Sequence, residues 1–290
     1  MLNNVVVFGA AGQLGVELVQ VLTNRGYTVH SFNRASVDIT NLTLLEQTLA
    51  PLDPKAVINA AAYNQVDVAE QEPQAAFAAN ALGVRNLAVA CRQLDALLVH
   101  FSTDYVFDGR LGRPYHEEDR PHPLGAYAVS KLAGELYAQA YLDNPLIIRT
   151  SGVFGPGGLR TARGNFVELM MRLAQSGQPI RVVEDHVASP TYAPALAART
   201  VDLMETAHRG VFHIGGGEAV SWFDFAGKIF RAAGMSPELR PTNEREYRTA
   251  ARRPKFSALA NARLAASGVA PMPPLDEALA RYMEDRIRYK

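Results

Sequence analysis

The sequence has one cysteine, one tryptophan and no excess of charge of either sign. The single cysteine, Cys91, rules out an internal disulfide, and its place in an apolar helical pattern predicts a buried core residue. The 29 basic residues balance the 29 acidic ones, which leaves no electrostatic basis for binding nucleic acid or an anionic membrane. No apolar run approaches the length of a membrane span. Because a predicted strand begins almost at once, we expect no signal peptide and a cytoplasmic protein.

Hydrophobic residues make up 48% of the sequence and charged residues 20%, as in an ordinary globular protein. At 290 residues the chain is long for one compact core. We therefore expect one nucleotide-binding domain with a smaller second lobe.

The first fifteen residues carry a strand followed by a glycine-rich turn. Residues 5–8 are β-branched or aromatic, and Gly9, Gly12 and Gly15 follow before an apolar helical pattern. Gly9 allows the turn, Gly12 leaves room for a pyrophosphate, and Gly15 lets the helix pack closely. The start of the helix offers free N–H groups and a partial positive charge to phosphate. This pattern predicts a dinucleotide-binding turn, and a glycine turn without a ligand is the alternative.

The end of the second predicted strand, residues 27–32, indicates which dinucleotide is preferred. Asn33 and Arg34 follow it, and residues 32–34 include no acidic side chain to hold the ribose hydroxyls of NAD. An arginine here suits the 2′-phosphate of NADP, so we predict NADPH as the better cofactor, with NADH also accepted. A solvated loop arginine is the alternative.

Strand and helix patterns alternate up to Arg149. Further strands are predicted at 56–62, 97–101, 146–149 and 211–214, with helices between them. The sequence therefore predicts an α/β fold, a Rossmann-type doubly wound parallel sheet with a smaller α/β substrate-binding domain. We expect residues 1–151 plus 192–215 in the dinucleotide-binding domain and 152–191 plus 216–290 in the other. In that second domain a helix at 165–175 is expected to face inward with Phe166, Leu169, Met170 and Leu173.

Polar residues that could take part in a reaction follow the predicted strand at 97–101. Ser102, Thr103 and Asp104 come at its carboxyl end, where ligands of parallel sheets bind. Tyr127 and Lys131 stand four residues apart, on one face of the next predicted helix. An ammonium beside a phenol stabilises the phenolate, so we expect the Tyr127 pKa to fall below its usual value of about 10. The acidic run at 117–119 is expected to be solvated, and we predict no metal site.

Three motifs follow one another along the chain: the glycine turn at 9–15, Ser102-Thr103, and Tyr127 with Lys131. In this order they resemble the motifs of the extended short-chain dehydrogenase/reductases. The run Ser-Thr-Asp-Tyr-Val-Phe-Asp-Gly at 102–109 is more specific and is similar to the dTDP-4-dehydrorhamnose reductase group. Segments at 60–63, 66–70, 149–151, 164–167, 189–191 and 253–259 resemble the same group, so the likeness spans nearly the whole chain.

The resemblance implies reduction of the 4-keto group of a nucleotide-linked 6-deoxy sugar, most closely dTDP-4-dehydrorhamnose to dTDP-rhamnose. In that scheme NAD(P)H gives the hydride, Tyr127 is the acid, Lys131 holds the nicotinamide ribose, and Thr103 hydrogen-bonds the reacting oxygen. The residues it assigns to the cofactor are Gly9, Gly12, Gln13, Leu14, Gly15, Asn33, Arg34, Asp38, Ile39, Ala60, Ala61, Ala62, Tyr63, Ser102, Tyr127 and Lys131. Those it assigns to the substrate are Val66, Thr103, Asp104, Gly152, Asn165 and Arg253.

Gly152 departs from the family pattern. Rhamnose reductases commonly carry a tryptophan after Arg-Thr-Ser, and here the position is glycine. We expect a wider sugar pocket, or another side chain such as Phe154 or Tyr192 in the gap.

Two alternative functions remain at this point. One is another reductase or epimerase of keto-sugar nucleotides, and the other is a non-catalytic subunit resembling the β subunit of methionine adenosyltransferase. The intact set of Thr103, Tyr127 and Lys131 favours an enzyme. The sequence leaves open the sugar, the base and whether the chain forms a homodimer. Metal-bridged dimers are known among rhamnose reductases, but no ligand cluster stands out in this sequence.

Overall fold

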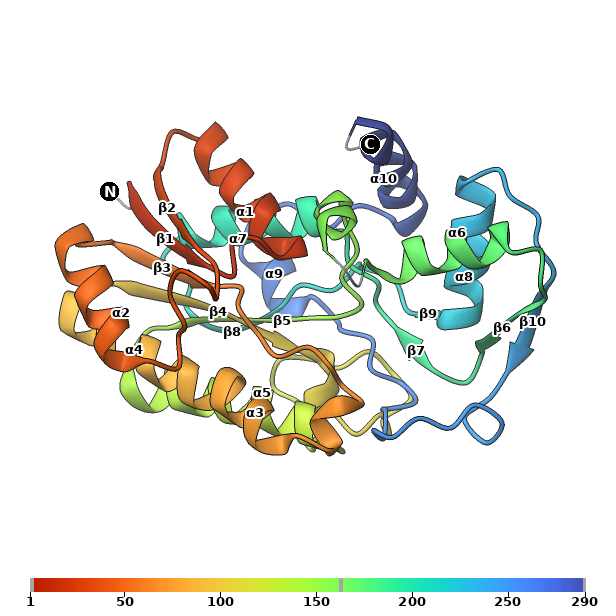
Figure 1. Cartoon of the computed structure of the whole chain (residues 1–290), viewed down its shortest axis with the longest axis horizontal. Coiled ribbons are helices and arrows are strands. Elements are labelled where there is room, and N and C mark those ends of the chain that lie inside the picture. Colours follow the sequence, from red (N-terminus) through yellow and green to blue (C-terminus); the bar gives the residue numbers. More distant parts are fainter. Residues whose placement is uncertain (1–2, 162–163, 289–290) are drawn as a thin grey trace.

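A six-stranded parallel sheet forms the centre of the computed structural model, which describes residues 3–161 and 164–288 (Figure 1). The strand order is β2-β1-β3-β4-β5-β8, so the chain starts inside the sheet and winds outward in both directions. This arrangement confirms the predicted fold class. The strands are β1 (Asn4–Phe8), β2 (Thr28–Phe32), β3 (Ala56–Asn59), β4 (Leu97–Thr103), β5 (Leu146–Thr150) and β8 (Gly210–His213).

Helices cover both faces of this sheet (Figure 1). Side chains of a strand point alternately to its two faces, so Val5 and Val7 of β1 pack under α1 and α7, and Val6 packs under α2 and α4. Cys91 of α4 is fully buried in the second of these cores, as predicted. The α-helices of this lobe up to α7 are α1 (Gln13–Asn24), α2 (Leu42–Leu49), α3 (Pro73–Phe77), α4 (Gly83–Leu94), α5 (Ala126–Tyr141) and α7 (Ala193–Met204), and α3 packs on α5.

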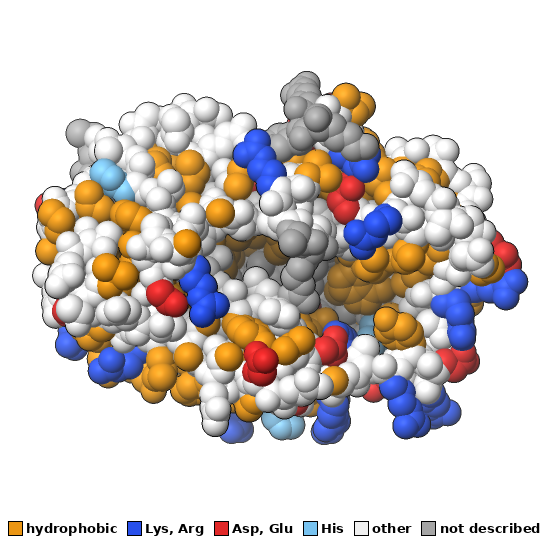
Figure 2. Space-filling view, viewed as in Figure 1, with side chains coloured by type: hydrophobic (Ala, Val, Ile, Leu, Met, Phe, Trp, Pro, Cys, Tyr) orange, Lys and Arg blue, Asp and Glu red, His pale blue; other side chains and the backbone are white. Residues whose placement is uncertain are grey.

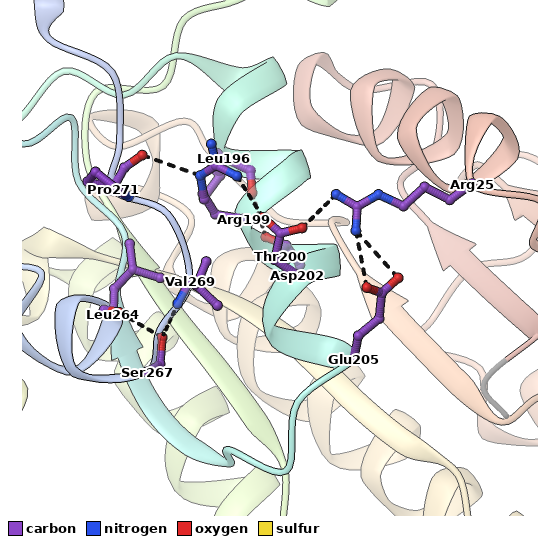
Figure 3. Close-up of polar contacts among 10 residues, drawn as sticks. All are labelled: Arg25, Leu196, Arg199, Thr200, Asp202, Glu205, Leu264, Ser267, Val269 and Pro271. Atoms are coloured by element: carbon purple, nitrogen blue, oxygen red, sulfur yellow. Dashed lines mark hydrogen bonds and ion pairs between the residues drawn. The ribbon is translucent and has the colours of Figure 1, made fainter.

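Ion pairs fasten α1 to α7 on one face (Figure 3). Arg25, just past the end of α1, lies 2.6 Å from Asp202 and 3.3 Å from Glu205. On the other side of α7, Arg199 donates to the carbonyl of Pro271 at 3.4 Å, so a segment near the C-terminus returns to the first lobe (Figure 3). Leu264 of α9 (Ala262–Ala266) is accordingly buried in the core of the sheet.

The second lobe has its own aromatic-rich core, in which Phe154, Phe225 and Tyr282 are fully buried. Two of its helices begin at polar caps, since Asn165 accepts from the N–H of Glu168 and Ser221 from that of Asp224. Its elements are α6 (Phe166–Gln175), α8 (Trp222–Ala232), α10 (Leu275–Arg288), β6 (Ile180–Val183), β7 (Val187–Ala188), β9 (Val220–Ser221) and β10 (Leu239–Thr242). Strand β6 pairs with β10 in parallel, and β7 pairs with β9 antiparallel.

The buried face of α6 differs from the predicted one. Val167 and Met170 pack into the lobe, whereas Leu169 and Leu173 are each 37% exposed. The expected inward face was therefore wrong for these two leucines. Both side chains line the cleft between the lobes, so they form part of the surface of this cleft and not of the core.

Candidate active site

The carboxyl ends of β1, β3, β4 and β5 meet at one cavity of about 540 Å³. This edge of a parallel sheet is where ligands of doubly wound folds bind. Most of the predicted residues that follow these strands line it, together with the start of α5. The lining includes Gly12, Gln13, Leu14, Ala60, Ala61, Ala62, Ser102, Thr103, Asp104, Tyr127, Lys131 and Gly152.

The glycine turn has no room for side chains at two of its three glycines. Gly9 has a φ of +74°, and a Cβ there would lie 2.5 Å from the backbone nitrogen of Ala61. A Cβ on Gly15 would lie 2.1 Å from the carbonyl oxygen of Gly9. Gly12 precedes α1 as its N-cap residue and lines the cavity, and it has no side chain with which to cap the first N–H groups of the helix. The turn therefore presents the positive end of a helix to the cavity.

Tyr127 and Lys131 project from the first turns of α5 into the same cavity. The phenol of Tyr127 lies near the hydroxyl of Thr103 at the end of β4, and this hydroxyl favours the ionised phenol. The Lys131 ammonium donates to the carbonyl of Phe101, with 2.6 Å between Nζ and oxygen. The sequence-predicted trio is thus brought together by two neighbouring elements.

The expected lowering of the Tyr127 pKa is wrong for this arrangement. Burial raises the pKa of the phenol, and the nearby carboxylate of Asp104 adds to the effect, while the Thr103 hydroxyl opposes it. Lys131 contacts the Phe101 carbonyl, and burial lowers the pKa of its ammonium to about 8. Spacing along a helix placed both groups on one face but did not reveal how deeply they are buried.

Asp104 is held by hydroxyl groups from three parts of the chain. Its carboxylate accepts from Thr103 at 3.1 Å, from Ser151 at 2.9 Å and from Ser257. Burial raises its pKa to about 6, even though the three hydroxyls favour the ionised form. Both oxygens are therefore engaged within the protein, and the predicted contact of Asp104 with substrate stays a prediction.

Behind the cavity, Ser102 belongs to a buried charged network. Its hydroxyl donates to Glu135, which also forms a 2.7 Å ion pair with Arg149. Both charged side chains are almost fully buried, so each depends on the other for compensation. Ser102 therefore supports α5 from the sheet side, and its predicted contact with the cofactor stays a prediction.

Asn80 fastens the loop after β3 to α5. It lies in a π-helical turn, η3 (Ala78–Leu82), and is almost fully buried. Its amide oxygen accepts from the N–H of Tyr63, and its nitrogen donates to the Tyr63 carbonyl and to Ser130. Asn80 thus faces its protein partners and not solvent.

The loop after β2 carries the residues predicted to select the cofactor. Arg34 is exposed, with 89% of its side chain accessible, and its Nε lies 3.3 Å from the carboxylate of Asp38. Asn33 accepts from the N–H groups of Ala35 and Ser36, which shapes the loop. Ile39 is buried in the core behind it. A phosphate bound to the exposed Arg34 would therefore share the guanidinium with the carboxylate of Asp38.

A larger cleft of about 740 Å³ lies between the lobes and is lined mainly by residues of the second lobe. Figure 2 shows a hollow in the middle of the molecule, with hydrophobic side chains gathered beside it. The cleft combines apolar residues with a set of cations, Arg181, Arg245, Arg248, Arg252, Arg253 and Lys255. Arg253, a predicted substrate residue, forms a 2.7 Å ion pair with Asp67. Of these cations only Arg253 was predicted as a substrate residue, although the density of arginine between 240 and 253 also signals Arg245, Arg248 and Arg252.

An aromatic pair connects the two cavities. Tyr105 lines the cleft and Tyr127 lines the cavity beside the glycine turn, and their rings meet edge to face with centroids 6.3 Å apart. Val66 lies in a small recess with both. Asn165 does not line either cavity among the described residues, because its amide bonds to Gln13 and to the carbonyl of Gly155.

Comparison with known proteins shows one family over nearly the whole chain. The RmlD substrate binding domain matches residues 3–287. The chain belongs to this family. It is 38% identical over 273 residues to the dTDP-4-dehydrorhamnose reductase of Streptomyces griseus, covering 92% of this chain and 88% of that one. It is 34% identical over 285 residues to the spore coat polysaccharide biosynthesis protein SpsK of Bacillus subtilis, covering 98% of each.

A solved structure extends the likeness to three dimensions. The dTDP-4-dehydrorhamnose reductase of Bacillus anthracis, crystallised in complex with NADP, matches with a TM-score of 0.93 and 37% identity. The match covers 98% of this chain and all of that one. The RmlD-family fold therefore extends over 98% of the chain.

One cluster that sequence reasoning did not find lies at the rim of the cleft in this RmlD-family chain. Ligand atoms of Asp185, His186 and Glu244 lie within 4.8 Å of one another. The ammonium of Lys255 is 3.6 Å from Asp185 and 3.3 Å from Glu244. A cation of the chain itself thus balances both carboxylates.

The side chain that lies beside Gly152 is not one of the two that the sequence suggested. Phe154 and Tyr192 are buried in the core of the second lobe, so the suggestion that either fills the gap was wrong. The side chain beside Gly152 is Trp222, whose Cη2 lies 3.3 Å from where a Cβ on Gly152 would be. The one tryptophan of the sequence thus lies beside Gly152.

Proposed function

We propose that this chain reduces the 4-keto group of a nucleotide-linked 6-deoxy sugar, with dTDP-4-dehydrorhamnose as the substrate and NADPH as the hydride donor. The observation that carries the proposal is the meeting of Thr103, Tyr127 and Lys131 in one cavity beside the glycine turn. The names of the Streptomyces griseus and Bacillus anthracis relatives support the same reaction.

The cavity fits a dinucleotide on its own geometry. The close-packed glycine turn leaves the start of α1 facing the cavity, where the N–H groups of Gln13 and Leu14 suit a pyrophosphate. The Lys131 ammonium has three donors and uses one on the Phe101 carbonyl, which leaves two for ribose hydroxyls. Arg34 stands where an adenosine 2′-phosphate is expected. NADPH, when bound, supplies the hydride.

In this proposal Tyr127 protonates the oxygen that develops negative charge at the sugar C4. Burial keeps the phenol protonated at neutral pH, so it is a donor before reaction begins. Thr103 lies near the phenol and is placed to hydrogen-bond the same oxygen. The cations of the larger cleft suit the diphosphate of the substrate, since arginine forms charge-assisted bonds to phosphate oxygens.

The two cavities suggest that one lobe binds the cofactor and the other the substrate. We assign residues 1–151 with 192–215 to cofactor binding and residues 152–191 with 216–290 to the substrate. We also place the protein in the cytoplasm, where NADPH and nucleotide sugars are made. No helix within residues 3–161 and 164–288 is long and apolar enough to cross a membrane.

We further propose a homodimer through the face formed by α3, η3 and α5. Four large apolar side chains on these neighbouring elements are at least 36% exposed, namely Phe77, Leu82, Val129 and Leu136. Light scattering of the wild type is expected to give twice the chain mass, and Leu136→Asp is expected to give a monomer. A monomeric wild type would contradict this part.

A substrate panel tests the reaction itself. NADPH oxidation is measured with dTDP-, UDP- and GDP-linked 4-keto-6-deoxy sugars, and the isolated product is tested for a new hydroxyl at C4. We expect the dTDP-linked substrate to give the highest kcat/KM. Absence of turnover with every member of the panel would overturn the proposed function.

A further inference from the structure

Trp222 is held rigidly at the start of α8. It is the only tryptophan in the chain. Its backbone N–H donates to the carbonyl of His186 at 3.1 Å, and the preceding Ser221 caps the helix. Its ring packs edge to face on Phe166, with centroids 4.7 Å apart. The half-buried indole therefore has a fixed position, and it forms part of the wall of the larger cleft.

The same indole lies next to Gly152, which lines the cavity that holds Thr103, Tyr127 and Lys131 and is the catalytic cavity of the proposed function. Gly152 lines that cavity, and a Cβ at this position would lie 3.3 Å from Cη2 of Trp222 and 3.3 Å from Cα of Pro190. The φ of Gly152 is +50°, a conformation that favours glycine. Trp222 consequently occupies the space in which a side chain from position 152 would stand. It lies where the two cavities adjoin.

A nucleotide sugar that reacts here has to pass this junction. Its reacting carbon must reach Tyr127 in the catalytic cavity, while the cations that suit its diphosphate lie in the larger cleft. The sugar ring, which connects the two groups, then lies beside Gly152 and Trp222. An indole offers an apolar surface to the C–H groups of a pyranose and to the methyl group of a 6-deoxy sugar.

We infer that Trp222 is a specificity-determining residue that packs against the sugar of the bound nucleotide sugar. The inference rests on the proposed function for the identity of the sugar. Its geometric basis is the position of Trp222 beside Gly152. This position does not depend on which base the nucleotide carries.

Fluorescence tests the contact without turnover. Because Trp222 is the only tryptophan, intrinsic fluorescence excited at the red edge reports on this residue alone. The wild type is titrated with dTDP-rhamnose, the product of the proposed reaction, and separately with dTDP, without NADPH. We expect dTDP-rhamnose to change the emission clearly more than dTDP does at saturation. Equal changes, or none with dTDP-rhamnose, would overturn the inference.

Kinetics test the consequence for specificity. Trp222→Ala is expected to lower kcat/KM for the nucleotide sugar by about 10- to 100-fold, the range for loss of an apolar contact in a pocket. KM for NADPH is expected to stay within threefold, and Trp222→Phe is expected to restore most of the loss. Phe223→Ala is the matched control, because Phe223 is the next residue of α8 and lines a different depression.

The variants also separate this inference from the proposed function. Turnover by the wild type with equal losses in Trp222→Ala and Phe223→Ala would overturn the inference alone. If the wild type shows no turnover, the proposed function fails, and the fluorescence titration still decides whether Trp222 contacts the sugar.

Discussion

Replacing Asp104 by asparagine should change how the stability of the protein depends on pH. The carboxylate is 3% exposed, and burial raises its pKa to about 6 from the usual 3.8. The folded state therefore holds its proton more tightly than the unfolded state does. As pH rises from about 4 to about 6, ionisation of Asp104 costs more in the folded state, so the free energy of unfolding falls.

The size of this effect follows from the two pKa values. One unit of pKa difference corresponds to about 1.4 kcal/mol. For values of 3.8 and about 6, the contribution of Asp104 to the free energy of unfolding falls by about 2 kcal/mol between pH 4.5 and pH 7.5. Asp104→Asn removes this ionisation and keeps a side chain of similar shape.

Urea denaturation of both proteins at these two pH values measures the difference. The wild type is expected to lose about 2 kcal/mol more than Asp104→Asn on going from pH 4.5 to pH 7.5. Asp143→Asn, which removes an exposed carboxylate in the loop before β5, is the control and should follow the wild type. Identical pH dependence in the wild type and Asp104→Asn would refute the argument that Asp104 is buried at a cost.

Two further substitutions test the cofactor loop and the loop after β3. The wild type should prefer NADPH over NADH by about 3- to 30-fold, and Arg34→Ala should raise KM for NADPH while leaving that for NADH nearly unchanged. Equal weakening with both cofactors would contradict the assignment of Arg34 to the 2′-phosphate. Asn80→Ala should lower the free energy of unfolding by roughly 2–4 kcal/mol, because it removes the two hydrogen bonds of Asn80 to the backbone of Tyr63 and the one to Ser130. A loss below about 0.5 kcal/mol in urea denaturation would show that water replaces the amide.

The parts of the fold that could be predicted depend on local pattern. Buried strands such as those at 5–8 and 146–148 are indicated by continuous apolar residues, and the glycines at 9 and 15 indicate the turn that they permit. The meeting of Thr103, Tyr127 and Lys131 in one cavity also followed, because the edge of a parallel sheet collects the segments after its strands.

What the sequence could not supply depends on contacts between distant segments. Ser257 bonds to Asp104 across 153 positions, and nothing in the local pattern links them. The Tyr127 pKa depends on burial, which helical spacing does not report. The exposed leucines of α6 show the same limit, since an apolar stripe does not say whether it meets a core or a ligand cleft.

The most direct test of the proposed mechanism is the rate of NADPH oxidation with dTDP-4-dehydrorhamnose in wild type and Tyr127→Phe. Phenylalanine keeps the ring but removes the acidic proton, so kcat at saturating substrate should fall by about 10² to 10⁴. NADPH binding, measured by titration, should be little changed. A robust wild-type rate that Tyr127→Phe lowers less than threefold would mean that another group is the acid.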